Sequence, residues 1–175
     1  MADYPAHLVR EHRLANGTAL TIRPVRPQDA GLTRALLEGL SEHARRLRFK
    51  QAAHAVSPLP IGFLTDVDYE RHMAFLATIS LDAGEQAVGE ARYLVEPDGR
   101  TCEFAIAVAD AWQGTGVAGL LMEALFRAAR AKGLKSVAGL VAGENARMLR
   151  FVHTLGFEAE PAAQDPRVVR VVKRL

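Results

Sequence analysis

The first third of the chain alternates short apolar runs with residues typical of turns. Asn16 and Gly17 separate two segments with strand character in VREHRLANGTALTIRPV, which predicts a β-hairpin with a type I′ turn because both residues tolerate positive φ. Apolar residues at helical spacing from Gln28 to Leu40 predict a helix, and Ser41 is a good N-cap for a second, basic helix over EHARRLRFK. The following QAAHAVSPLPIG, rich in Pro and Gly, is interpreted as a loop and as a mobile flap.

The pattern then changes to strands and ends as an alternation of strands and helices. HMAFLATIS, QAVGEARYLVE and TCEFAIAVA follow one another closely, with a Pro97-Asp98-Gly99 turn between the last two, which predicts an antiparallel meander. A helix with one apolar stripe is predicted from about Gly114 to Lys132, closed by Gly133. Next come a strand (LKSVAGLVA), a helix (NARMLRFVHTL) ended by Gly156, and a last strand (VVRVVKRL). The order indicates a mixed α/β fold.

Composition narrows the class of protein. The 175 residues fit one domain, and 49% hydrophobic with 24% charged residues is ordinary for a soluble globular chain. A net charge of +2 is too small to suggest a nucleic-acid partner, and neither a signal-peptide pattern nor a membrane-length apolar run is visible, so the expected location is the cytoplasm. Cys102 is the single cysteine and no histidines show helical ligand spacing, so neither an internal disulfide nor a bound metal is expected.

The stretch WQGTGVAGLL contains a literal G-x-G-x-x-G at Gly114, Gly116 and Gly119. A dinucleotide fingerprint needs its first glycine directly after a strand at the start of a βαβ unit, and here the preceding strand ends near Val108, too far upstream. The expected ribose-binding acid is also missing, because position 139 is glycine. What remains is a glycine-rich turn that offers backbone N–H groups and a helix dipole to an anion, or small residues that serve only close packing.

Two segments carry a strong resemblance to a known family. CEFAIAVADAWQGTGVAGLLMEAL and ENARMLRFVHTLGF resemble the acetyl-CoA core of the GNAT superfamily of N-acetyltransferases, whose signature Q/R-x-x-G-x-G/A is matched by Gln113, Gly116 and Ala118. RLANGTALTIRPVRPQDA, SEHARRLRF and DVDYERHMAFLA are similar to the acetyltransferase module of bacterial Pat-type protein lysine acetyltransferases. The resemblance implies a GNAT-like fold, a central and mostly antiparallel twisted sheet with flanking helices. It also implies one free-standing acetyltransferase domain over residues 1–175.

The resemblance also implies where the cosubstrate binds. Backbone groups on the strand would pair with the pantetheine arm and polarise the thioester carbonyl, the turn would hold the pyrophosphate, and an asparagine would contact the arm as well as cap its helix. The residues implied for acetyl-CoA or CoA are Ile106, Val108, Gln113, Gly114, Thr115, Gly116, Val117, Ala118, Gly119 and Asn145.

Acetylation of an amine needs a base, because a lysine ammonium with a pKa of about 10.4 is no nucleophile. Glu103, in the apolar strand CEFAIAV, is the candidate, unless it is a solvated edge residue; Glu90 and Asp110 are weaker alternatives. Many family members place a tyrosine where this chain has Val152, so no side chain is assigned as general acid, and the adjacent His153 points elsewhere on the helix. An acyl-carrying Cys102 is disfavoured, because no histidine is positioned to activate it.

The function that follows is transfer of acetyl from acetyl-CoA to a primary amine. The Pat-type resemblance points to a protein lysine, for example on an acyl-CoA synthetase, and composition does not exclude a small-molecule amine or antibiotic as acceptor. A catalytically weak module that binds CoA only to regulate partners is the alternative from another class. A homodimer is left open.

Overall fold

The chain forms one sheet with helices on both faces. The computed structural model describes residues 3–51, 60–161 and 165–175. The strands are β1 (Arg10–Arg13), β2 (Ala19–Pro24), β3 (His72–Leu81), β4 (Gly84–Val95), β5 (Thr101–Val108), β6 (Ser136–Ala142), β7 (Glu158–Pro161) and β8 (Val168–Arg174). The helices are α1 (Ala30–Glu38), α2 (Glu42–Gln51), α3 (Ile61–Thr65), α4 (Val117–Ala131) and α5 (Ala146–Thr154), with 3-10 turns η1 (Ala6–Leu8), η2 (Pro27–Asp29) and η3 (Asp110–Trp112).

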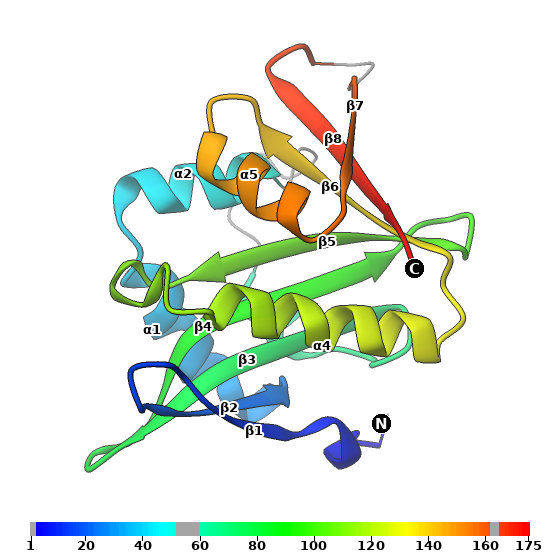
Figure 1. Cartoon of the computed structure of the whole chain (residues 1–175). Helices are drawn as coiled ribbons and strands as arrows, with labels where there is room; N and C mark the ends of the chain where they lie inside the picture. Colours follow the sequence, from blue (N-terminus) through cyan, green and yellow to red (C-terminus); the bar gives the residue numbers. More distant parts are fainter. Residues whose placement is uncertain (1–2, 52–59, 162–164) are drawn as a thin grey trace.

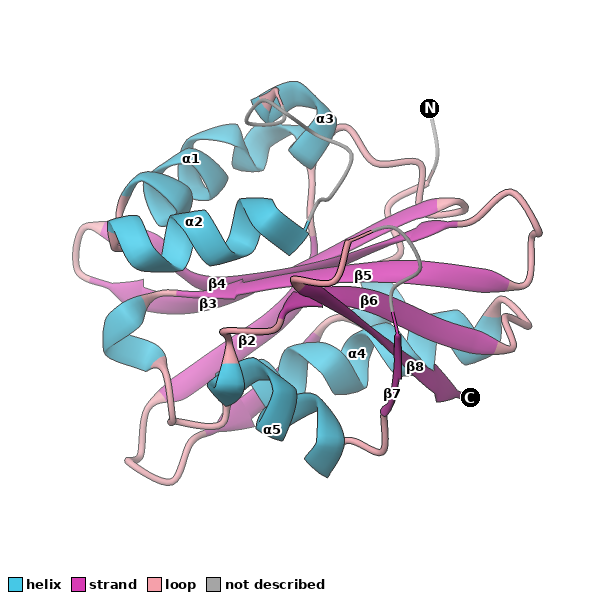
Figure 2. Cartoon of the chain, turned by 90° about the horizontal axis from the view of Figure 1, so that it is seen from above, coloured by secondary structure: helices cyan, strands magenta, loops and turns pink. Residues whose placement is uncertain are grey.

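The sheet runs in the order β1-β2-β3-β4-β5-β6-β8-β7 (Figure 1). Its neighbouring strands are antiparallel except β5 and β6, which are parallel. Helices α1, α2 and α3 cover one face and α4 and α5 cover the other (Figure 2). The predicted mixed fold with a mostly antiparallel sheet is therefore confirmed.

Helix α4 packs its apolar stripe against the middle of the sheet. Val117, Leu121 and Leu125, one helical turn apart, are completely buried, and the helix ends before Gly133, whose φ of +75° is the left-handed conformation expected of a C-terminal glycine. Because this helix is anchored along its whole length, the turn before it has a fixed position at the edge of β5.

The N-terminal hairpin forms as predicted, but its turn is not type I′. The Leu14 carbonyl accepts from the Gly17 N–H, and among the described residues of this loop only Gly17 has a positive φ, +86°. Asn16 instead accepts a hydrogen bond from the Thr18 N–H with its side chain. A type I turn followed by a left-handed glycine uses a longer loop, in which Asn16 needs no positive φ.

Besides the 3-10 turns, one short helix and one short strand were not predicted. Helix α3 begins at Ile61, inside the stretch interpreted as a flap, and β7 follows α5 as a four-residue strand. Both are too short to show a hydrophobic period. The rest of the predicted flap, residues 52–59, lies outside the described residues.

Strands β5 and β6 pair only over Thr101–Glu103 and Ser136–Ala138, and beyond that they run apart (Figure 1). Gly139 follows the last paired residue, and a Cβ there would lie 2.3 Å from the Phe104 ring. Phe104 therefore packs directly over the backbone of β6, at the point where the two strands separate. The opening between them is the main irregularity of the sheet.

Candidate active site

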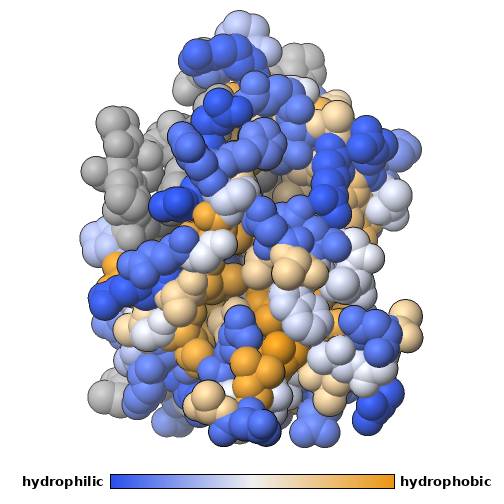
Figure 3. Space-filling model, turned by 90° about the vertical axis from the view of Figure 1, so that its left-hand side faces the viewer, coloured by the Kyte–Doolittle hydropathy of each residue, from blue (hydrophilic) through white to orange (hydrophobic). Residues whose placement is uncertain are grey.

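A cavity of about 560 Å³ lies at the open end of β5 and β6. Its walls come from α2, the end of β5, η3 and the turn after it, the start of α4, and the first two turns of α5. Figure 3 faces the side of the molecule on which η3 and the start of α4 lie, and apolar surface gathers at its centre between hydrophilic side chains. The residues that line the cavity include apolar side chains such as Leu47, Ile106 and Phe151 and polar ones such as Ser41 and Gln113.

The turn before α4 has the backbone that its glycines predict. Gly114 and Gly116 have φ values of +78° and +97°, and Gly116 is the N-cap of α4. A Cβ added at Gly116 or Gly119 would meet nothing within 4 Å, so the turn leaves open space at the positive end of a helix of 15 residues. This space fits a phosphate group that approaches the backbone closely.

The predicted turn residues divide into two groups. Gln113, Gly114, Gly116, Ala118 and Gly119 line the cavity.

The other two turn residues face away from it. The Thr115 hydroxyl donates to the Trp112 carbonyl, and Val117 is fully buried in the core. Their side chains support the turn from within, so any contact they make with a ligand would have to come from their backbone.

The open edge of β5 carries the peptide groups of Ile106 and Val108. The Ala109 N–H donates to Val88 and the Thr101 carbonyl accepts from Glu96, so the odd-numbered residues of β5 bond to β4. In a regular antiparallel ladder the residues between them direct N–H and C=O to the other side. At Ile106 and Val108 that side is the opening, as expected for an edge that pairs with an extended ligand.

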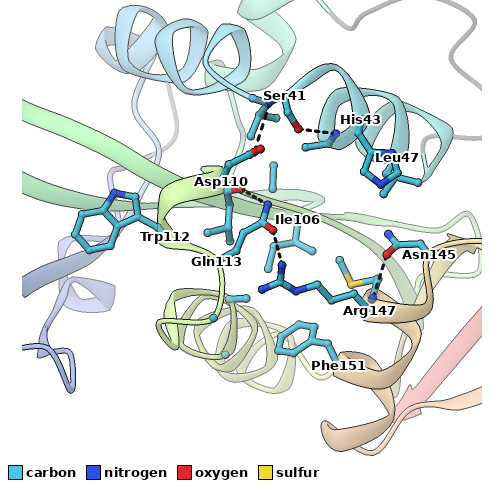
Figure 4. Close-up of a pocket in the computed structure, with 18 of the residues that line it drawn as sticks. Ser41, His43, Leu47, Ile106, Asp110, Trp112, Gln113, Asn145, Arg147 and Phe151 are labelled. Carbon is cyan, nitrogen blue, oxygen red and sulfur yellow. Dashed lines mark hydrogen bonds between the residues drawn. The ribbon is translucent and has the colours of Figure 1, made fainter.

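The side chains of Gln113 and Arg147 link the turn to α5 across the opening. The Gln113 amide donates to the Val108 carbonyl (Nε2 to O, 3.2 Å) and accepts from Arg147 (Nη1 to Oε1, 2.8 Å), as Figure 4 shows. Asn145 is the N-cap of α5, where its Oδ1 accepts from the Met148 N–H at 3.1 Å, and it also lines the cavity. The capping role predicted for Asn145 is present, at a position open to a ligand.

Sequence reasoning missed one wall of the cavity and one cation. Ala44 and Leu47 of α2 line it, and the N–H of Ser41 lies 3.5 Å from Asp110 Oδ1, which joins the start of α2 to η3. The helix was predicted, but its position depends on tertiary packing. Arg147, two residues after Asn145, lines the cavity too, and its closeness to the family asparagine was a usable signal.

Glu103 lies where β5 and β6 still pair, just before the opening. It is half-buried and stands opposite Leu94 on β4 and Ala138 on β6. Leu94 in turn stands opposite His72 on β3, whose ring stacks on Phe63 of α3 with centroids 4.9 Å apart. Glu103 therefore faces the layer of α1 to α3, and it does not line the cavity itself.

Glu103, Leu94 and His72 form a row across three strands, and a cluster of buried polar side chains lies beside it on the same face of the sheet. Arg92 donates to Glu90, to the Leu64 carbonyl at 3.1 Å, and contacts His72 Nε2 at 3.1 Å. Glu90, Arg92 and His72 are all at most 7% exposed. Burial, together with the positive charge of Arg92, lowers the pKa of His72 to about 4, so the imidazole is neutral at physiological pH.

Burial and position bear on the other residues considered for catalysis. Cys102 is buried, and burial raises the pKa of its thiol to about 12, which disfavours the acyl-carrier alternative. Val152 is 1% exposed and packs in the core, while His153 is exposed and does not line the cavity. Asp110 lines the cavity at its border as an exposed residue.

Among the described residues no group of three or more His, Cys, Asp or Glu side chains is arranged to hold a metal ion. No helix in the described part of the chain is long and apolar enough to cross a membrane.

Comparison with known proteins assigns the family. The model of the acetyltransferase (GNAT) family matches residues 57–157. An acetyltransferase of Pseudomonas aeruginosa is 32% identical over 162 residues, which are 93% of this chain and 86% of that protein.

Solved structures agree with this. The GNAT domain of S. lividans PAT superposes with a TM-score of 0.86 at 26% identity, covering 99% of this chain and 100% of that domain. A cAMP-binding acyltransferase from Mycobacterium smegmatis has the same fold, with a TM-score of 0.62 at 22% identity; the match covers 97% of this chain and 48% of that protein. The chain belongs to the GNAT family and is an acetyl-CoA-dependent N-acetyltransferase.

Proposed function

We propose that the protein transfers acetyl from acetyl-CoA directly to the side-chain amine of a protein lysine, with Glu103 as the general base. One observation carries this proposal. Glu103 is the last residue of β5 that pairs with β6, and the open edge at Ile106 begins three residues, or about 10 Å, further on. A pantetheine arm paired with that edge would bring its thioester towards Glu103.

The transfer step uses this arrangement as follows. Glu103 takes a proton from the lysine ammonium, the amine nitrogen attacks the thioester carbonyl carbon, and the carbon–sulfur bond breaks to release CoA thiolate. The N–H groups at the open edge of β5 polarise the carbonyl oxygen. The attacking nitrogen loses its second proton as the amide forms. Because Val152 is buried and apolar, we assign the relay of that proton to the thiolate to water.

Glu90 and Asp110 are weaker candidates for the base. Glu90 is 1% exposed and its carboxylate accepts from Arg92, so it is both enclosed and engaged. Asp110 lies at the border of the cavity beyond the far end of β5, with its Oδ1 near the Ser41 N–H. Neither combines access for an amine with a position beside the point where β5 and β6 separate.

The surface around Glu103 supports an acceptor with a long aliphatic stem. Leu94, directly opposite Glu103, and Phe63, which stacks on the neighbouring His72, are both 39% exposed. Apolar side chains beside a carboxylate suit the four methylene groups and the terminal ammonium of lysine better than a polyhydroxylated small amine. The resemblance to Pat-type proteins supports the same acceptor, with an acyl-CoA synthetase as the partner to test.

The first experiment measures acetyl transfer from acetyl-CoA to a purified acyl-CoA synthetase and to a panel of aminoglycosides and other small amines. Glu103→Gln should lower kcat by about 10²- to 10⁴-fold with an unchanged KM for acetyl-CoA. Glu158→Gln, which removes an exposed strand carboxylate on β7, is the matched control and should change neither constant. A folded Glu103→Gln enzyme with wild-type kcat would exclude Glu103 as the base.

The same assay separates the competing functions. Preference for the small amines would support the small-molecule alternative, and CoA binding without turnover of any acceptor would support a regulatory module. Leu94→Ser should raise KM for the protein acceptor alone. Leu81→Ser, at the distant β3–β4 hairpin and 51% exposed, is its control.

A further inference from the structure

Gln113, the first residue of the family signature, uses both ends of its side-chain amide inside the protein. Nε2 donates to the Val108 carbonyl and Oε1 accepts from Arg147 Nη1 (Figure 4). The amide therefore spans from the end of β5 to the first turn of α5. It holds an arginine across the opening, and its own polar atoms are already engaged.

Arg147 is the residue that this bridge orients. It is exposed, it is the second residue of α5, and its Nη2 lies 3.6 Å from the position a Cβ would take at Gly114. Of the described residues that line the cavity, it is the one lysine or arginine, and no described carboxylate forms an ion pair with it. The positive charge is therefore available to a ligand at the turn.

A phosphate at this turn needs such a charge. The helix dipole supplies only about half an elementary charge, whereas a pyrophosphate carries about two. A guanidinium donates in a planar fork that matches phosphate oxygens, and Gln113 occupies Nη1 while Nη2 points to the turn. Arg147 therefore brings a positive charge and the N–H groups of Nη2 to the turn beside Gly114.

We propose that Arg147 is the cationic ligand of the CoA pyrophosphate and that Gln113 is its positioning residue, acting through Arg147 rather than on the ligand. This inference rests on the proposed binding of acetyl-CoA at the turn. It assigns to α5 a binding role for a side chain that lies outside the glycine-rich signature.

The test begins with Arg147→Gln and its matched control Arg150→Gln. Arg150 is an exposed arginine on the same helix that does not line the cavity. Arg147→Gln should raise KM for acetyl-CoA and Kd for CoA by about 10- to 100-fold at an unchanged saturating kcat, because a hydrogen bond to a charged group is lost. Arg150→Gln should leave both constants at the wild-type values. Equal constants in Arg147→Gln and wild type would overturn the proposal.

Truncated thioesters identify the phosphate. Acetyl-dephospho-CoA lacks the 3′-phosphate and acetyl-pantetheine lacks all phosphates. The increase in KM caused by Arg147→Gln should persist with acetyl-dephospho-CoA and disappear with acetyl-pantetheine. A penalty that disappears already with acetyl-dephospho-CoA, or that persists with acetyl-pantetheine, would contradict the assignment to the pyrophosphate.

The positioning role of Gln113 is tested by a double-mutant cycle. If Gln113 acts through Arg147, Gln113→Ala should raise KM for acetyl-CoA, but should add little in an Arg147→Gln background. Additive effects would show that Gln113 acts on the ligand independently. Wild-type binding of CoA is measured first. Its absence would refute the proposed acetyl-CoA site itself, whereas binding unaffected by Arg147→Gln refutes only the present inference.

Discussion

Replacing Gly116 by alanine separates the backbone of the turn from its ligand. Gly116 has a φ of +97°, and a Cβ there would meet nothing within 4 Å, so alanine adds backbone strain without a clash. An L-residue in left-handed backbone costs about 1–2 kcal/mol. For a chain of this size each kcal/mol lowers Tm by about 2–4 °C, so Gly116→Ala should lower it by about 2–8 °C.

Gly116→Ala should weaken CoA binding by more than the backbone strain alone implies. Gly116 lines the cavity, so the added methyl group occupies open space where the pyrophosphate is proposed to approach the backbone. A displaced phosphate loses charge-assisted hydrogen bonds worth about 1.5–3 kcal/mol each. The Kd for CoA should therefore rise by at least about tenfold for each bond lost.

Gly17→Ala is the matched control. Gly17 has a φ of +86° with equally open surroundings, but lies in the β1–β2 hairpin, which does not line the cavity. Thermal unfolding should show similar Tm losses in both variants, and calorimetric titration should show weakened CoA binding in Gly116→Ala alone. Wild-type CoA affinity in a folded Gly116→Ala protein would refute the role of this turn in phosphate binding.

Three further predictions follow from buried groups. Direct transfer requires that Cys102→Ala keep the wild-type kcat in the acetyl-transfer assay, and a lost kcat would point to an acyl-enzyme. Because the pKa of His72 is lowered to about 4, the unfolded state binds its proton first as pH falls, so the free energy of unfolding should drop by about 2 kcal/mol between pH 7 and pH 5 in denaturant titrations. His72→Gln should lack this part of the pH dependence, and an identical dependence would disprove a buried neutral imidazole. Asp29→Asn breaks the buried ion pair with Arg23, in which the Asp29 and Arg23 side chains are 3% and 6% exposed. The free energy of unfolding should fall by up to about 3–5 kcal/mol in the same titrations. A decrease below about 1 kcal/mol would show that Glu85, which also pairs with Arg23, compensates.

The predictable part of the fold came from local chemistry. Gly114, Gly116, Gly133 and Gly156 all adopt the positive φ that their positions in turns and at helix ends require. Ser41 caps α2 by accepting from the Ala44 N–H, as a serine before a helix should. Such signals depend on a few neighbouring residues, which is why one sequence suffices to find them.

The parts that escaped prediction depend on tertiary packing. Nothing local to α2 indicates that Ala44 and Leu47 face the end of β5, and the bridge from Gln113 to Arg147 joins residues 34 positions apart. The turn type at Asn16 was wrong because an Asn-Gly pair fits both a two-residue loop and a longer one. The role of Glu103 as a base stays a prediction. Its position beside the opening follows from the fold, whereas its part in proton transfer is tested only by kinetics.

Amide hydrogen exchange along β5, with and without CoA, tests the central claim most directly. If the pantetheine arm pairs with β5 as an added strand, the N–H groups of Ile106 and Val108 should become protected on binding. Those of Ala105 and Ala107, which already face β4, should change little. Saturating CoA that leaves Ile106 and Val108 unprotected, while slowing exchange elsewhere, would contradict binding in the opening between β5 and β6.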